Sequence, residues 1–152
     1  MKIIVGSDHF GWHLKELARE ILDELGHEVV DAGCAGPEGA VDYPDIAEEV
    51  AIRVAAGEFE RGVLACGTGI GMAMVANKVP GVRAACCHDP YSARRARMSN
   101  DAQILCLGEQ IVGPALARIL VEEWISSEFA GGRSAPKVAK MAEIDKRYRR
   151  MP

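Results

Sequence analysis

The sequence predicts a single α/β domain, residues 1–152, in which a parallel sheet of five strands lies between two layers of helices. Short apolar runs alternate along the chain with amphipathic stretches, which is the pattern of repeated strand–helix–strand units. Such units cross over in one hand, so their helices cover both faces of the sheet. A chain of 152 residues without a linker or internal repeat suits one hydrophobic core. The expected architecture is therefore a Rossmann-like three-layer sandwich.

Five short apolar runs, bounded by glycine, proline or acidic residues, are the expected strands. They lie at residues 2–8, 27–33, 62–66, 82–87 and 102–107. Apolar residues at three- and four-residue spacing indicate helices between and after them. These lie at residues 14–25, 46–56, 70–78, 90–98 and 113–126. Gly26 and Gly57 each follow a helical pattern and favour its end.

An extra C-terminal helix is expected at about Pro136 to Arg149. Its apolar stripe is thin, consisting of Val138, Met141 and Ile144, and charged residues surround it. A helix with so little apolar surface gains little by packing on its own sheet. The pattern therefore favours packing on a partner subunit.

The composition argues against several classes of partner. The formal net charge is −4, and no basic stretch is long enough to follow a nucleic acid. The basic cluster Lys146 to Arg150 fits the end of a helix, where cations are favoured. No apolar run approaches the thickness of a bilayer, and no signal peptide precedes the first strand. We expect a cytoplasmic protein with no nucleic-acid or membrane partner.

The five cysteines are odd in number and form no C-x-x-C pair. This usage indicates reduced thiols rather than disulfides or a zinc site, and we expect no metal. Cys86 and Cys87 are neighbours in one strand, so their side chains point to opposite faces. Together with Cys106, they are expected to be small core residues.

Three informative segments follow expected strands. GSDHFG follows the first strand, CGTGIG the third and CHDPYS the fourth. Ligands of open parallel sheets bind at the carboxyl ends of the strands. These three segments are therefore the expected site.

The glycine loop after the third strand, Gly67 to Gly71, fails the nucleotide fingerprints. It reads G-x-G-x-G rather than G-x-G-x-x-G, and no G-K-[ST] occurs. We therefore expect no nucleotide cofactor. The glycines are compatible with tight packing of strand on helix and, equally, with a cradle of amides for an anion.

Cys66 stands at the strand end, directly before this loop. Amides at the start of a helix stabilise a thiolate, which can act as a nucleophile or a general base. The same amides can hold an oxyanion such as an enediolate. Thiol and loop together fit proton abstraction next to a carbonyl, although a buried structural cysteine gives the same pattern.

Other polar residues near the strand ends are further candidates. Asp8 and His9 follow the first strand, and such a pair in a ligand-side loop favours a site. His13 lies one turn into the next helix and could face the same crevice. Arg133 and Lys137 are four residues apart, which fits either a phosphate clamp or a solvated helix face.

Six segments carry a family pattern: GSDHFG, DYPD (Asp42 to Asp45), CGTGIGMAMVANKVPGVRAA, PYSA (Pro90 to Ala93), SND (Ser99 to Asp101) and GGR. Together they resemble the ribose-5-phosphate isomerase B/galactose-6-phosphate isomerase family, collinearly over nearly the whole chain. The resemblance implies a metal-independent aldose–ketose isomerase of a phosphorylated sugar, without a cofactor. It also implies a homodimer or tetramer with sites shared between subunits.

The resemblance also implies roles by position. Cys66 would move the proton between carbons 1 and 2, and Thr68 would assist proton transfer on the sugar oxygens. The enediolate would be held by the amides of Gly67, Gly69, Ile70 and Gly71. Sugar hydroxyls would be contacted by Asp8 and Tyr43, and the phosphate by His9, Arg133 and Lys137. Asn100, next to Ser99, would reach the site of the partner subunit.

Three positions depart from the pattern of the ribose-phosphate enzymes. Ser99 stands where they usually carry a ring-opening histidine, and Gln110 and Lys137 stand where arginine is common. His13 or His88 could replace the missing group. A four-carbon sugar phosphate cannot close a five-membered ring, so its isomerase needs no ring opener.

Ribose 5-phosphate, the usual substrate of the family, is the expected one. The alternatives are erythrulose 4-phosphate, a six-carbon sugar phosphate and, from a different class, non-catalytic binding of a sugar phosphate. The intact pair Cys66 and Thr68 argues against the last alternative.

Overall fold

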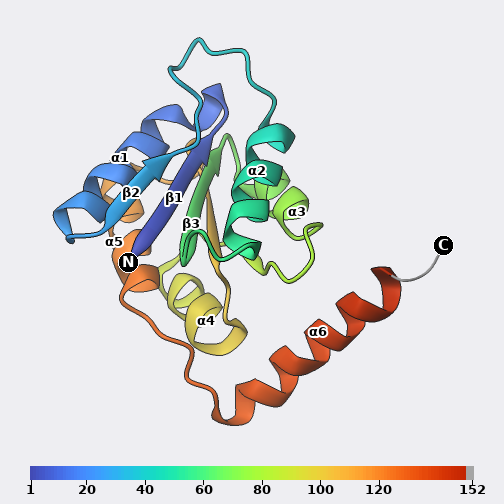
Figure 1. Ribbon diagram of the computed structural model, residues 1–152. Coiled ribbons are helices and arrows are strands. Elements are labelled where there is room, and N and C mark those ends of the chain that lie inside the picture. The colour runs from blue at the N-terminus through green and yellow to red at the C-terminus, as the bar shows by residue number, and fades with distance from the viewer. Residues whose placement is uncertain (150–152) are drawn as a thin grey trace.

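The computed structural model describes residues 1–149, and these residues form the predicted α/β sandwich (Figure 1). Arg150, the last residue of the basic cluster, and the expected end of the domain lie outside them. Within residues 1–149, one parallel sheet has the strand order β2-β1-β3-β5-β4. Its strands are β1 (Lys2–Ser7), β2 (Glu28–Asp31), β3 (Arg61–Cys66), β4 (Ala84–Cys86) and β5 (Ile104–Gly108). The order brings β1 next to β3, so the segments after these two strands are neighbours.

Helices cover both faces of the sheet, as predicted (Figure 1). One face carries α1 (Trp12–Glu24), α4 (Pro90–Asn100) and α5 (Pro114–Ile125). The other carries α2 (Tyr43–Ala55) and α3 (Ile70–Ala76). Alternate residues of each strand enter the two cores, and every residue of β3 is buried. β3 is therefore a rigid support for the cysteine at its end.

The helix after the second strand begins earlier than its apolar pattern predicts. That pattern starts at Ile46, but α2 begins at Tyr43. Pro44 favours the earlier start, because its ring fixes φ at a helical value. The N–H that proline lacks would have no partner in the first turn of a helix in any case. Tyr43 therefore lies on the first turn of a helix, at the edge where the strands end.

The C-terminal helix, α6 (Ala135–Arg149), follows a short 3₁₀ turn, η2 (Gly132–Ser134), and extends away from the sandwich (Figure 1). None of its described residues is buried, and Met141 and Ile144 are 37% and 50% exposed. Asp145 accepts a hydrogen bond from the Gly81 amide, and Arg149 donates to the Lys78 carbonyl. The thin stripe thus stays out of the core, and packing on a partner remains a prediction.

One prediction about the cysteines is wrong. Cys87 and Cys106 are buried as expected, but Cys86 is exposed. It is the last residue of β4, an edge strand, so one side of its position lacks a neighbouring strand. Cys87 packs in the core under α4 and α5, whereas the Cys86 sulfur lies 3.5 Å from the Thr68 carbonyl oxygen.

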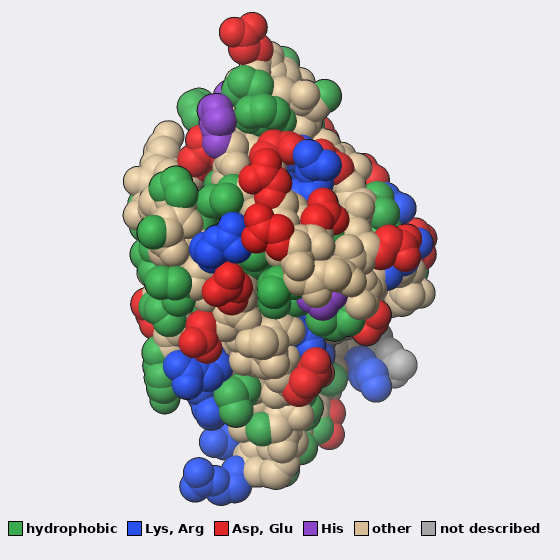
Figure 2. All heavy atoms as spheres, turned by 90° about the vertical axis from the view of Figure 1, so that its left-hand side faces the viewer, with side chains coloured by type: hydrophobic (Ala, Val, Ile, Leu, Met, Phe, Trp, Pro, Cys, Tyr) green, Lys and Arg blue, Asp and Glu red, His purple; other side chains and the backbone are tan. Residues whose placement is uncertain are grey.

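Acidic and basic side chains are interspersed on the side of the molecule that α1 and β2 form (Figure 2). This surface carries no broad field of one sign. In the part of the chain that the structure describes, no helix is long and apolar enough to cross a membrane.

Candidate active site

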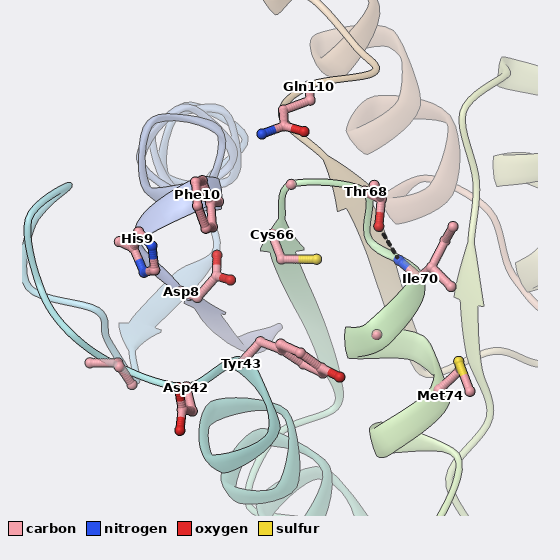
Figure 3. A pocket seen from close by; sticks show the side chains of 13 residues that line it. Asp8, His9, Phe10, Asp42, Tyr43, Cys66, Thr68, Ile70, Met74 and Gln110 are labelled. Carbon is pink, nitrogen blue, oxygen red and sulfur yellow. Dashed lines mark hydrogen bonds between the residues drawn. The ribbon is translucent and has the colours of Figure 1, made fainter.

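A pocket of about 740 Å³ lies at the carboxyl ends of β1 and β3 (Figure 3). It is open to solvent on one side. Its lining combines the segments after these strands with the first turns of α2 and α3. The lining residues are Asp8, His9, Phe10, Val41, Asp42, Tyr43, Cys66, Gly67, Thr68, Ile70, Gly71, Met74 and Gln110. Two of the three segments expected at this edge therefore meet in one cavity.

Cys66 occupies the centre of the pocket, with Asp8 on one side and the glycine loop on the other (Figure 3). Its side chain is 6% exposed. The Gly69 N–H donates a hydrogen bond to the sulfur over 3.1 Å. Such a donor stabilises a thiolate more than a thiol. The sulfur is therefore placed to act as a base toward a molecule in the pocket.

The glycine loop packs against the end of β5. A Cβ added at Gly108 would lie 2.6 Å from the carbonyl carbon of Thr68. At Gly69, where φ is +77°, an added Cβ would lie 2.9 Å from the carbonyl carbon of Leu107. Tight backbone packing, one of the two interpretations of the glycines, is thus present. It does not exclude the second, an anion cradle, because the Gly69 amide already points at Cys66.

Tyr43 and Thr68 also face this space (Figure 3). The Tyr43 ring covers Gly71 so closely that a Cβ there would lie 2.6 Å from the ring. The Thr68 hydroxyl oxygen accepts a hydrogen bond from the Ile70 N–H over 3.4 Å. A bulkier residue at position 71 would therefore displace the tyrosine that forms one wall.

Asp8 is buried and begins a 3₁₀ turn, η1 (His9–Gly11). One of its carboxylate oxygens accepts a hydrogen bond from the Gly11 N–H over 3.1 Å. Burial raises the pKa of the Asp8 carboxyl above its ordinary 3.8, and the Gly11 hydrogen bond opposes this only in part. The carboxyl thus takes up a proton more readily than an exposed one.

This shift predicts a pH-dependent stability effect of Asp8→Asn. Because the folded-state pKa is the raised one, the folded protein binds more protons, and stability is lost as pH rises from about 3.8 through that pKa. Asn removes the burial cost of the charge and keeps an acceptor for Gly11. We expect the variant to have a higher Tm than wild type at pH 7, with the gain shrinking toward pH 3.5. Asp42→Asn, at an exposed position on the same rim, is the control; equal gains at both pH values would contradict the expectation.

His9 is the only lining residue of the described pocket that can become a cation. Its ring lies against the Phe10 ring at a tilt of 39°, with centroids 4.1 Å apart, and its Nδ1 is buried without a hydrogen-bond partner. Within one chain, His9 is therefore the candidate for contact with an anion.

Gly69 is not among the lining residues, although its N–H donates to the Cys66 sulfur, and four further predicted site residues lie away from this pocket. Ser99 and Asn100 end α4, Arg133 belongs to η2 and Lys137 to α6. These elements lie at the opposite end of the sandwich from the pocket (Figure 1). Asn100, Arg133 and Lys137 are exposed, and the Ser99 hydroxyl is buried without a partner. One chain does not bring these residues together with Cys66, so their roles remain predictions.

His13 does not line the main pocket either. Its Nδ1 lies 3.0 Å from a carboxylate oxygen of Glu109, and the second oxygen accepts the Leu14 N–H. Both side chains line a separate cavity of about 280 Å³ next to α5. A role in opening a sugar ring stays a prediction.

Several lining residues were not among the predicted site residues: Phe10, Val41, Asp42, Met74 and Gln110. Gln110 follows β5, and its N–H donates to the Gly67 carbonyl over 3.0 Å. The rule that ligands bind at the ends of parallel strands could have identified it, since β5 lies next to β3.

Known proteins resemble this chain over nearly its whole length. A family model described as Ribose/Galactose Isomerase matches residues 3–141. Ribose-5-P isomerase B of Listeria innocua is 49% identical over 98% of this chain and 100% of its own length. D-erythrulose-4-phosphate isomerase of Pectobacterium atrosepticum is 45% identical over 93% of each chain. The solved structure of Clostridium thermocellum ribose-5-phosphate isomerase B is 51% identical, with a TM-score of 0.94 over 97% of this chain and 99% of that one.

Proposed function

Since this chain belongs to the ribose/galactose isomerase family, we propose that it interconverts ribose 5-phosphate and ribulose 5-phosphate through an enediolate. The observation that carries the proposal is Cys66 in the pocket with the Gly69 amide on its sulfur. A base flanked by backbone donors is what removal of a proton next to a carbonyl requires. The relatives named above supply the class of substrate.

In this mechanism the Cys66 thiolate removes the proton from carbon 2 of the open-chain aldose. Charge then develops on the carbonyl oxygen at carbon 1, where the loop amides between Gly67 and Gly71 can donate to it. The same sulfur returns the proton to carbon 1, while the hydroxyl proton moves between the two oxygens with the help of Thr68. Asp8 and Tyr43 hold sugar hydroxyls, because both face the cavity that contains Cys66.

The phosphate and the quaternary structure belong to the same proposal. His9 contacts the phosphate within the chain, while Arg133, Lys137 and Asn100 act in the pocket of a second subunit. Their exposure and their distance from their own pocket support this arrangement. Exposed apolar side chains beside the pocket, Ile70 and Met74, support an interface there. The working form is then a homodimer or a tetramer in the cytoplasm, an environment that suits five free thiols.

A four-carbon substrate is the second candidate, and Ser99 is the observation that favours it. A serine cannot serve as the imidazole that opens a furanose ring, and no histidine other than His9 lines the described pocket. Erythrulose 4-phosphate has no such ring to open. The Pectobacterium relative is named for that substrate.

A side-by-side assay separates the two candidates. We expect a kcat/KM for ribose 5-phosphate at least about tenfold above that for erythrulose 4-phosphate, in buffer with a chelator. Both sugars are measured on the same preparation, by following the ketose formed from one and the aldose formed from the other. A preference for the four-carbon sugar would overturn the ribose assignment and leave the isomerase reaction in place. If the protein converts neither sugar phosphate, both substrate assignments are wrong.

A further inference from the structure

Lys15 is a buried charge that the proposed chemistry does not use. Its side chain is 1% exposed, although it belongs to the first turns of α1. Its ammonium group lies 2.5 Å from an Asp31 carboxylate oxygen, 3.0 Å from a Glu16 oxygen and 3.0 Å from the Cys34 carbonyl oxygen. Its three donors therefore have three oxygen partners.

A buried ion pair is a poor device for stability alone. Removing a lysine from water costs several kcal/mol, and apolar replacements of buried pairs are often neutral or stabilising. Lys15 differs from a simple ion pair because one of its partners is a backbone carbonyl, that of Cys34. The contact fixes a segment of main chain that has no helix or strand of its own.

That segment, residues 32–42, is tied down at its start and forms a wall of the pocket at its end. The two carboxylate oxygens of Asp31 have different partners. Oδ2 accepts from Lys15, and Oδ1 accepts a hydrogen bond from the Gly33 N–H over 2.8 Å. The main chains of Gly33 and Cys34 bond to Ser7 over 2.7 and 2.8 Å. Ser7 directly precedes Asp8, while Val41 and Asp42 line the same cavity as Cys66.

We propose that Lys15 is a positioning residue for substrate binding, which holds segment 32–42 against the end of β1 and so sets the part of the pocket wall that Val41 and Asp42 form. The inference deepens the proposed function, because the wall belongs to the same pocket. Without the ammonium group, the Cys34 carbonyl and the Asp31 carboxylate lose a shared donor. The segment contains Gly36, Pro37 and Gly39 and has no regular structure to replace that anchor.

The test compares Lys15→Met with Lys15→Arg and with Arg19→Met. Arg19 is the matched control, because it bonds to the same Glu16 but does not reach segment 32–42. We expect Lys15→Met to raise KM for ribose 5-phosphate about tenfold while kcat changes less than about threefold, the signature of weakened substrate binding with the chemical step left intact. Lys15→Arg should recover most of the loss, and Arg19→Met should behave as wild type.

Amide hydrogen exchange provides a readout that does not depend on the substrate. We expect faster exchange in segment 32–42 of Lys15→Met, with the amides of β3 and β5 still protected. If Lys15→Met fails to fold, the double variant Lys15→Met/Asp31→Asn removes the carboxylate charge left unpaired, keeps an acceptor for the Gly33 N–H and still lacks the donor to Cys34. Unchanged KM and unchanged exchange in either folded variant would overturn the proposal. Should wild type lack isomerase activity, the exchange result still decides whether Lys15 holds the segment.

Discussion

Replacing Cys66 by alanine is expected to reduce kcat at least about a thousandfold while the fold and the binding of the sugar phosphate persist. No neighbouring group can take over the proton transfer easily. Asp8 is another acid or base near the centre of the pocket, but the Gly11 amide holds its carboxylate on the side of Cys66 away from the glycine loop, whose amides would hold the enediolate. We therefore expect turnover to depend on the sulfur at the end of β3.

The Cys66→Ala experiment is sharpest when catalysis and binding are measured together. Steady-state assays give kcat, and calorimetric titration with ribose 5-phosphate gives the affinity of the inactive variant. Cys87→Ala is the matched control, because burial raises the pKa of that thiol to about 11 and keeps it uncharged at neutral pH. Wild-type activity in Cys66→Ala would overturn its role as base. Binding without turnover in wild type itself would favour the non-catalytic class.

The fold followed from local patterns because each pattern has a direct physical cause. Buried parallel strands read as short apolar runs, and the amphipathic stretches between them can only cover the sheet faces. The same argument placed Cys66, Asp8 and the glycine loop at one edge, where the pocket lies. The start of α2 was predicted too late, because Tyr43 to Asp45 lie outside its apolar pattern and only Pro44 signals the extra turn.

What local patterns could not provide was packing between distant segments. Cys86 and Cys87 are neighbours in the sequence, but Cys87 packs in the core under α4 and α5, whereas Cys86 ends the edge strand β4 beside the glycine loop and stays exposed. Lys15 resembles any solvated lysine of a helix, because its partners Asp31 and Cys34 are distant in sequence. The roles proposed for Asn100 and Arg133 involve a second subunit, and no local pattern of one chain positions such a subunit.

Gly11→Ala is expected to damage both stability and activity, although Gly11 is not itself in the pocket. Its φ of −116° suits alanine, so the cause is steric rather than conformational. An added Cβ would lie 2.4 Å from the carbonyl carbon of Ala65 and 2.5 Å from the Cys66 nitrogen, which are main-chain atoms of β3. Since a central strand cannot yield, η1 and the start of α1 must move away. We expect a loss of about 3 kcal/mol in the free energy of unfolding, the upper part of the range for overpacking.

The same displacement should separate the two halves of the pocket. Gly11 donates to Asp8, and η1 carries His9, so moving the turn shifts both side chains relative to Cys66. We therefore expect kcat/KM to fall about a hundredfold in the fraction that remains folded, as a displacement near 1 Å can cause. Urea unfolding and steady-state assays measure the two effects. Gly113→Ala is the control, because a Cβ at Gly113 meets no atom within 4 Å. A Gly11→Ala variant as stable and active as that control would contradict the prediction. It would mean that η1 can move freely and that the close contact between Gly11 and β3 does not set the distance from Asp8 to Cys66.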